Sequence, residues 1–169
     1  MMNNTSSGPN DDIEKLINKY SDILFRVSLF KLGNMCDAED AVQDTFIKYY
    51  IKSPCFNDEE HRKAWLIRVC VNRCTDIIRY RKNHLTINID EINELSAEDK
   101  LCDSGITEYL MQLPDKYRIV MLLYYTEEMS TEQISKIIGK TSSAVKMRLK
   151  KGRKLLAEKY KEGVSEDEN

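Results

Sequence analysis

Five cysteines and two histidines are the residues of this chain that could carry nucleophilic or metal chemistry. Cys70 and Cys74 lie four positions apart and so share one helix face, but no other pair has the spacing of metal ligands. The number of cysteines is odd, and no histidine is positioned as a base for a thiol. We therefore predict buried or bystander thiols, with a metal, redox or thiol-enzyme role for Cys70 or Cys74 as the alternative. The full set is Cys36, Cys55, Cys70, Cys74, Cys102, His61 and His84.

Positive charge is concentrated in two blocks, although the net charge of the chain is −2. Residues 61–82 hold seven Lys or Arg against one acid, and residues 140–161 hold nine against one. Residues 83–107 lie between them and hold six acids against one lysine. Local basic patches are typical of proteins that bind an anionic polymer, whatever their total charge. The alternative is that both blocks are solvated helix faces.

Apolar spacing in the first half predicts three helices, over residues 11–30, 38–51 and 59–80. Gly33 ends the first helix, Asp37 is the expected N-cap of the second, and Pro54 begins a loop that reaches residue 60. The stripes of the three helices can share one core, which predicts a domain over residues 11–82. Trp65 is expected in that core, while for Phe56 the core and an exposed position are equally open.

Residues 83–105 lose periodicity and gain acids, which predicts a flexible acidic linker. Four shorter helices are expected beyond it, in a second domain over residues 106–161. The predicted fold class is therefore all-α, with two small helical domains joined by the linker. No stretch approaches the ~20 apolar residues that span a bilayer, and the N-terminus lacks the layout of a signal peptide. We therefore expect a cytoplasmic protein with no membrane insertion.

The last two predicted helices form the strongest single pattern. A helix of about eight residues is followed by the turn Gly139–Lys140–Thr141 and a helix rich in Lys and Arg, which is the layout of a helix-turn-helix. Ala144, Val145, Leu149 and Leu156 can pack inward on Ile134 and Ile138. The opposite face would then carry Lys146, Met147, Lys150, Lys151 and Arg153. Thr141, Ser142 and Ser143 would offer hydroxyl and backbone N–H groups to phosphate. An amphipathic surface helix without a ligand is the alternative.

The middle block suggests a second kind of nucleic-acid contact. Tyr49, Tyr50, Phe56 and Trp65 lie around a basic helix, beside a polar loop. Exposed aromatic rings among cations suit unpaired bases, because stacking contributes ~1–3 kcal/mol per base.

With these elements placed, the chain resembles the small, extracytoplasmic-function group of bacterial sigma factors, which keeps regions two and four. AEDAVQDTFIKYY (38–50) and AWLIRVCVNRCTDIIRYRK (64–82) are similar to region two. LPDKYRIVMLLYYTEEMSTEQISKIIGKTSSAVKMRLKKGRKLL (113–156) is similar to region four. The resemblance implies a factor that binds core RNA polymerase and directs promoter-specific initiation, with no metal, cofactor or catalytic residue. A stand-alone helix-turn-helix regulator is the alternative, but it leaves the polar face at 39–44 without a role.

The resemblance also implies roles for individual residues. The polymerase-docking residues, facing the coiled coil of the largest subunit, are Asp40, Gln43, Asp44 and Tyr50. The residues that hold the melted minus-ten strand are Phe56, Asn57, Asp58, His61, Arg62, Arg68, Arg73, Arg79 and Arg81. The residues that read the minus-thirty-five duplex are Thr141, Ser142, Ser143, Lys146, Met147, Lys150, Lys151 and Arg153. Further implied partners are the polymerase flap and an anti-sigma factor.

Three sites depart from the family pattern. Ser143–Ala144 stands where many relatives have a Gly-Thr pair. Met147 stands at a base-reading position, where it can contact thymine methyl groups but cannot make bidentate hydrogen bonds. Gly152 stands where alanine is usual. A mid-helix glycine costs ~1 kcal/mol against alanine, which predicts a less rigid helix end.

Overall fold

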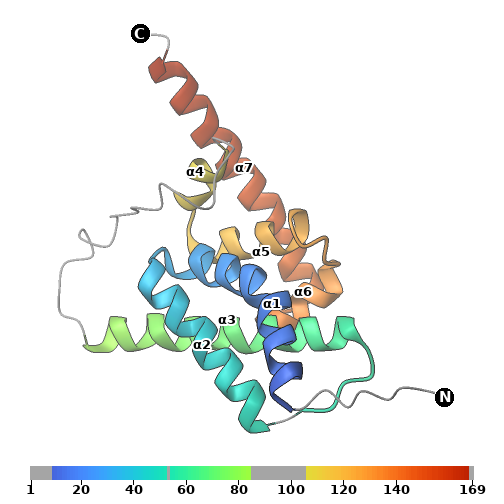
Figure 1. Cartoon of the computed structure of the whole chain (residues 1–169). Coiled ribbons are helices and arrows are strands. Elements are labelled where there is room, and N and C mark those ends of the chain that lie inside the picture. The colour runs from blue at the N-terminus through green and yellow to red at the C-terminus, as the bar shows by residue number, and fades with distance from the viewer. Residues whose placement is uncertain (1–8, 53, 85–105, 168–169) are drawn as a thin grey trace.

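The computed structural model describes residues 9–52, 54–84 and 106–167, and every described element is a helix (Figure 1). The elements are α1 (Pro9–Leu32), α2 (Met35–Lys52), α3 (Glu59–His84), α4 (Ile106–Met111), α5 (Asp115–Tyr125), α6 (Thr131–Ile138) and α7 (Ser142–Asp167). The all-α prediction is confirmed. The predicted linker over 83–105 lies outside the described residues, apart from its first two positions, which belong to α3. Among the described helices none is long and apolar enough to cross a membrane.

Helices α1, α2 and α3 pack on one another around a common core. Leu24 and Val27 of α1 and Leu66 and Ile67 of α3 are completely buried there. Burying a side chain of this kind contributes about 1.5–3 kcal/mol, which favours the packing of the three helices. Trp65 packs against the edge of the core, as expected from its spacing.

The turn between α1 and α2 is tighter than predicted. Gly33 has a left-handed φ of +69°, and α2 already begins at Met35. The side chain of Asn34 accepts a hydrogen bond from the backbone N–H of Asp37 at 3.0 Å. The prediction that Asp37 is the N-cap is therefore wrong, because Asn34 does the capping and Asp37 lies in the first turn.

The second helical unit is built by α4 to α7. Ile119 and Leu123 of α5, Ile134 of α6 and Val145 of α7 are buried between the helices. Gly152 is buried where α7 crosses α5, and a Cβ atom added there would lie 2.7 Å from Met121 Sδ. The structure therefore gives this glycine a packing role, because its missing side chain lets α7 approach α5 closely. Helix α7 also continues to Asp167, beyond the predicted end of the second domain at residue 161.

The two units are in contact with each other. Helix α5 packs along α1, and α6 packs against α3. The C-terminal part of α7 extends away from these four helices (Figure 1). This closed arrangement was not predicted from the sequence.

Candidate nucleic-acid interface

The α6–α7 corner has the geometry of a helix-turn-helix. Ser130 is the N-cap of α6 and forms a complete capping box with Gln133, in which each side chain bonds the other residue's backbone N–H. Gly139 ends α6 in the left-handed conformation, with φ at +63°. A non-glycine side chain is strained at such a position, so glycine fixes where the chain turns into α7.

The outward face of α7 carries the side chains that were predicted to read the duplex. Lys146, Lys150 and Lys151 are exposed, and none of them makes a hydrogen bond or ion pair within the described part of the chain. Met147 is 72% exposed beside them. Arg153 is also exposed, and its Nη1 donates to the Tyr125 hydroxyl at 3.3 Å.

Two of the three predicted hydroxyls at the start of α7 are already engaged. Thr141 Oγ1 accepts a hydrogen bond from the N–H of Ala144 at 3.2 Å and so caps the helix. Ser142 Oγ lies 3.0 Å from a carboxylate oxygen of Glu132. The backbone N–H of Glu132, and after it this hydroxyl, hold the pKa of the Glu132 carboxyl below its usual range. Only Ser143 is exposed without such a bond among the described residues.

One face of α2 collects the predicted polymerase-docking residues. Asp40 and Gln43 are exposed, and Tyr50 is 64% exposed further along the helix. Asp44 is held by Arg73 of α3, at 2.6 Å between Oδ2 and Nε. Sequence reasoning missed Ile47 and Ile51, which are exposed and continue this face at helical spacing. Their signal was two isoleucines outside the predicted buried stripe.

Phe56 anchors the loop before α3. Its ring stacks against Tyr49 with centroids 6.2 Å apart, and meets Trp65 edge-on at 5.8 Å. The guanidinium of Arg62 lies 5.8 Å from the same ring. Phe56 is therefore half-buried in an aromatic cluster. Of the core and exposed positions that the sequence left open, the structure favours packing.

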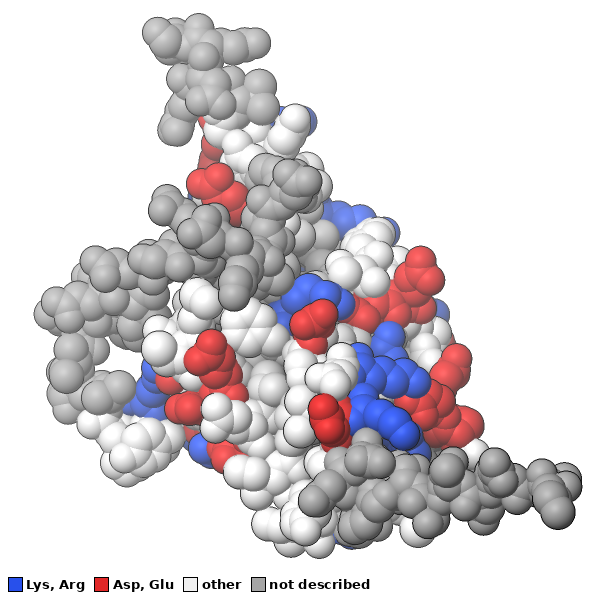
Figure 2. All heavy atoms as spheres, viewed as in Figure 1, with Lys and Arg blue, Asp and Glu red and all other residues white. Residues whose placement is uncertain are grey.

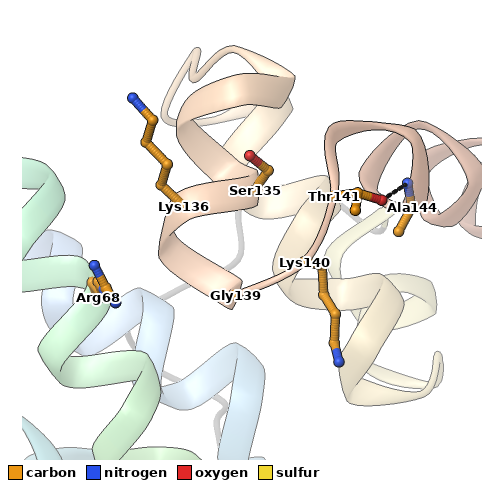
Figure 3. A pocket seen from close by; sticks show the side chains of 7 residues that line it. All are labelled: Arg68, Ser135, Lys136, Gly139, Lys140, Thr141 and Ala144. Atoms are coloured by element: carbon orange, nitrogen blue, oxygen red, sulfur yellow. Dashed lines mark hydrogen bonds between the residues drawn. The ribbon is translucent and has the colours of Figure 1, made fainter.

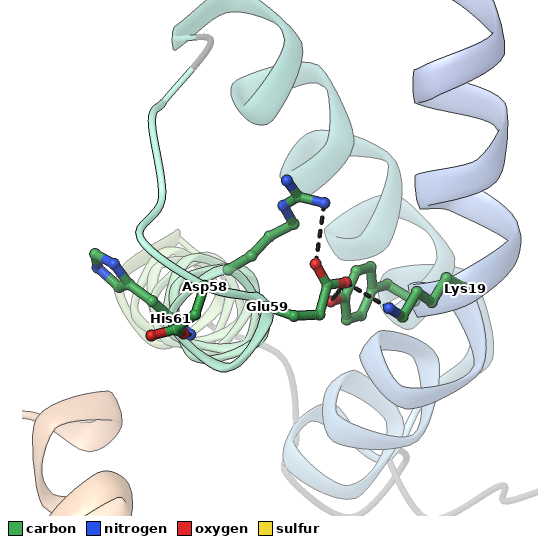
Figure 4. A network of polar contacts seen from close by, with 6 residues as sticks. Lys19, Asp58, Glu59 and His61 are labelled. Carbon is green, nitrogen blue, oxygen red and sulfur yellow. Dashed lines mark hydrogen bonds and ion pairs between the residues drawn. The ribbon is translucent and has the colours of Figure 1, made fainter. Parts of the chain in front are cut away.

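The next residues of the loop also make local bonds. Asn57 and Asp58 are exposed, and Asp58 accepts a hydrogen bond from the backbone N–H of His61 at 2.7 Å, which caps α3. Glu59 faces α1, where it binds Lys19 at 2.6 Å and also the hydroxyl of Tyr20 (Figure 4). Burial, and then this carboxylate, raise the pKa of Tyr20. The end of the loop therefore contacts α3 through Asp58, and the first residue of α3, Glu59, contacts α1.

The predicted arginines of α3 differ in their partners. Arg73 binds Asp44 of α2, and Arg81 binds Asp37 at the start of α2. Two more pairs lie within α3, since Arg62 binds Glu59 and Arg79 binds Asp76. Arg68 is exposed and makes no hydrogen bond or ion pair in the described residues.

A charged clasp holds the two helical units together. Glu127, in the loop after α5, is only 7% exposed and binds Arg26 of α1 at 2.9 Å and Lys63 of α3 at 3.2 Å. Lys31 of α1 binds Asp115 of α5 at 2.9 Å. Figure 2 shows Lys and Arg interspersed with Asp and Glu over the face of the molecule that is turned toward the viewer in Figure 1. Sequence reasoning missed the clasp, because these partners are 64 to 101 residues apart along the chain.

Four of the five cysteines lie in the described residues. Cys36 and Cys55 are exposed, and the described residues contain no group of three or more His, Cys, Asp or Glu side chains that could hold a metal ion. Cys70 and Cys74 are buried in the core of the first unit. The hydrogen bond with Cys70, and then burial, raise the pKa of Cys74, so this thiol keeps its proton. Cys102 lies outside the described residues.

Comparisons with known proteins match both units. The family model "Sigma-70 region 2" matches residues 16–84, and "Sigma-70, region 4" matches residues 105–156. The chain is 27% identical to the ECF RNA polymerase sigma factor SigW of Bacillus subtilis, over 92% of both chains. It is 29% identical to SigM of the same organism, over 92% of this chain and 99% of SigM.

Two solved structures share the fold. One is the sigma factor RpoE in complex with the anti-sigma factor NepR from Bartonella quintana, with a TM-score of 0.73 and 23% identity over 89% of this chain and 97% of that one. The other is CnrH in complex with the cytosolic domain of CnrY, with a TM-score of 0.61 and 23% identity over 89% and 88%.

Proposed function

The chain belongs to the extracytoplasmic-function group of the sigma-70 family, and on this premise we propose that it binds core RNA polymerase and directs it to promoters through two separate DNA contacts. The observation that carries the proposal is the exposed cationic face of α7. This helix begins directly after the turn at Gly139, and its other face packs on the core of the second unit. We propose no catalytic step for the protein itself. We also propose that it acts in the cytoplasm, together with the polymerase.

Helix α2 is the proposed polymerase-docking element. Asp40 and Gln43 supply exposed polar groups, and Ile47, Tyr50 and Ile51 supply exposed apolar area on the continuation of that face. Such a mixture suits a helical partner with basic and apolar side chains, for which we propose the coiled coil of the largest polymerase subunit. Asp44 would join the contact through its second carboxylate oxygen, since one oxygen is held by Arg73.

The loop before α3 is the proposed contact to the melted minus-ten strand. The aromatic cluster around Phe56 and the Asp58 cap hold this loop in one conformation. A preformed loop can select an extruded base, because extrusion costs a few kcal/mol that a matching pocket must offset. The exposed groups available for this are Asn57, Asp58 and His61, with Arg68 for a nearby phosphate.

Helix α7 is the proposed reader of the minus-thirty-five duplex. Its exposed lysines suit phosphates and base edges in the major groove, and Met147 suits a thymine methyl group. The two promoter elements are centred near minus ten and minus thirty-five, so they are about 25 base pairs apart, which is roughly 85 Å at about 3.4 Å per pair. Arg68 and Thr141 line one cavity in the closed arrangement. Because the two DNA elements lie much farther apart than two residues of one cavity, we propose that the two units separate when both elements are bound.

We also propose that an anti-sigma protein regulates this chain. Two proteins of the same fold, RpoE and CnrH, were solved in complex with NepR and CnrY respectively, and their folds cover most of this chain. The polymerase flap remains the proposed partner of the second unit.

In-vitro transcription tests the proposed function. Core polymerase is incubated with a fragmented genomic library, with and without the protein, and the 5′ ends of the transcripts are sequenced. We expect new start sites that share two spaced motifs. If no start appears while the protein alone still binds duplex DNA, the stand-alone regulator is the better account.

The docking face has its own test with a matched control. Asp40→Lys with Gln43→Ala is expected to lower the affinity for core polymerase tenfold or more, because it reverses a charge at the centre of the contact. Glu14→Lys with Asn18→Ala makes the same chemical changes on an exposed face of α1 and is expected to leave the affinity unchanged. Equal affinities for both double variants would show that docking occurs elsewhere.

A further inference from the structure

An open cationic cavity lies between the two helical units, and two of its cations, Lys136 and Lys140, have no role in the proposed promoter contacts. Its volume is about 570 Å³, within the range of small-ligand sites. Arg68 of α3 lies across from the α6–α7 turn, with Lys136 and Lys140 extending to either side of that turn (Figure 3). The remaining lining residues are Ser135, Gly139, Thr141 and Ala144.

The charges around this cavity are uncompensated. None of the lining residues is acidic, and Arg68, Lys136 and Lys140 make no hydrogen bond or ion pair in the part of the chain that the structure describes. This differs from the rest of α3, where most cations are held by a carboxylate. Three like charges around one concavity repel one another, and an anion between them would relieve that repulsion.

The hydroxyl groups that line the cavity help to define which class of anion it can bind. Thr141 Oγ1 accepts its hydrogen bond from Ala144, so that bond does not use its O–H proton, which remains available to an anion. Ser135 Oγ donates to the carbonyl of Glu132 at 2.7 Å and has no proton left for an anion. The cavity therefore offers one guanidinium, two ammonium groups on flexible stems and one hydroxyl donor. This set matches several phosphate oxygens better than a single carboxylate.

We propose that this cavity binds phosphate groups of a polyphosphate or a nucleic-acid strand and thereby holds the two units closed. Arg68 comes from the first unit, while Lys136, Lys140 and Thr141 come from the second, so the site is complete only in the closed arrangement. Ligand binding and separation of the units for promoter binding would then compete. The inference goes beyond the proposed function, and its test needs neither polymerase nor promoter.

Calorimetric titration of the full chain with inorganic triphosphate at low ionic strength tests the site. We expect saturable binding that weakens as salt is added. Lys136→Ala with Lys140→Ala should weaken it about tenfold, and Arg68→Ala should also weaken it, because the site draws on both units. Lys15→Ala with Lys48→Ala removes two exposed lysines elsewhere and should leave it unchanged. An equal loss in this control, or no loss in Arg68→Ala, would overturn the proposal.

A charge reversal in the clasp separates a shared site from a merely basic surface. Glu127→Lys adds positive charge but breaks the contacts to Arg26 and Lys63, so a shared site predicts weaker triphosphate binding. Glu128→Lys makes the same change at the neighbouring exposed residue, which has no ion pair among the described residues, and should bind as tightly as the parent or tighter. Tighter binding by both variants would overturn the shared site. The lysine and Arg68 variants, which are on the surface, keep the test decisive if Glu127→Lys does not fold.

Two further titrations identify the source of the phosphate. Adenosine triphosphate represents free polyphosphates, and a four-nucleotide oligothymidylate represents a nucleic-acid strand. Binding of either one with loss in Lys136→Ala/Lys140→Ala supports the site and names its ligand. Failure of inorganic triphosphate and both of these probes to bind would contradict it.

Discussion

The two basic blocks of this chain differ in what their charges do. On α3, five of the seven cations between His61 and Lys82 are bound to a carboxylate of the protein itself. On α7, the reading face keeps Lys146, Lys150 and Lys151 without an ion pair in the described residues. The sequence assigns similar positive charge to both blocks, but most cations of α3 already bind a carboxylate of the protein, whereas these three lysines of α7 do not. Local charge counts therefore overstate the cationic surface wherever acids on other helices can reach it.

This difference predicts that DNA binding by the two surfaces depends differently on salt concentration. A phosphate contact by a bare lysine releases counterions and is strongly salt-dependent. An arginine that already binds a carboxylate must break or share that pair before it gains a phosphate. The first unit is therefore expected to depend on its ordered loop and on Arg68, and the second on its exposed lysines.

The largest effect is expected from the bare lysines. Lys146→Ala with Lys151→Ala should lower affinity for promoter duplex about a hundredfold, or about 2.7 kcal/mol, and reduce the slope of log affinity against log salt by about 2. Fluorescence anisotropy at several salt concentrations measures both quantities. Arg73→Ala with Arg79→Ala is the matched pair on α3, and its slope should change by less than about 1. Equal slope changes in the two pairs would contradict the comparison.

The same variants distinguish base reading from phosphate contact. If duplexes of unrelated sequence lose affinity to the same extent as the promoter, the two lysines contact phosphate only. A larger loss on the promoter would assign base contacts to them.

The second effect concerns what holds the reading face in place. Gly152→Val should destabilise the protein by about 2 kcal/mol, because the new side chain meets the buried Met121, and this overpacking outweighs the better helix propensity of valine. Chemical denaturation measures the free energy of unfolding. Lys154→Val places the same side chain at an exposed position of α7 and should cost a few tenths of a kcal/mol. A similar cost for both variants would show that the contact with α5 is unimportant.

Much of the fold was predictable because the apolar spacing is local. The Gly139 turn and the outward lysines of α7 follow from the order of residues alone, and the structure places them as expected. The helix start at Met35 was missed, because Asn34 and Asp37 are both good caps and only the tight turn at Gly33 decides between them. The packing role of Gly152 was missed because it depends on Met121, which lies on another helix.

The site was less predictable than the fold. Which arginines of α3 are neutralised depends on carboxylates such as Asp37 and Asp44 on α2, and no pattern within α3 reveals them. The clasp at Glu127 and the shared cavity at Arg68 depend on how two separate units meet. Contacts of this kind have no periodic signal, so they appear only with the tertiary structure.

A third effect tests the pairing on α3 directly. A double-mutant cycle with Asp44→Ala and Arg73→Ala should give a coupling free energy of about 0.5 kcal/mol, since both side chains are partly exposed. The cycle is measured from free energies of unfolding in denaturant. Arg68→Ala combined with Asp44→Ala is the control and should show additive effects, because Arg68 makes no ion pair in the described residues. Additive behaviour in both cycles would mean that the basic block of α3 is as bare as that of α7.

The smallest effect concerns Glu59, whose ties to α1 order the loop. Hydrogen bonds from Lys19, and then from Tyr20, hold the pKa of the Glu59 carboxyl below its usual range. A carboxyl with a lowered pKa in the folded state contributes stability above its unfolded pKa of about 4.3, and the contribution is lost as pH falls through the folded pKa.

Glu59→Gln should therefore lower the free energy of unfolding by a few tenths of a kcal/mol at pH 7 and by less at pH 3. Glu60→Gln, at the exposed neighbouring position, should show no such pH dependence. Denaturation at the two pH values measures the difference, and a deficit in Glu59→Gln that persists at pH 3 would show that the carboxylate charge is not what ties the loop to α1.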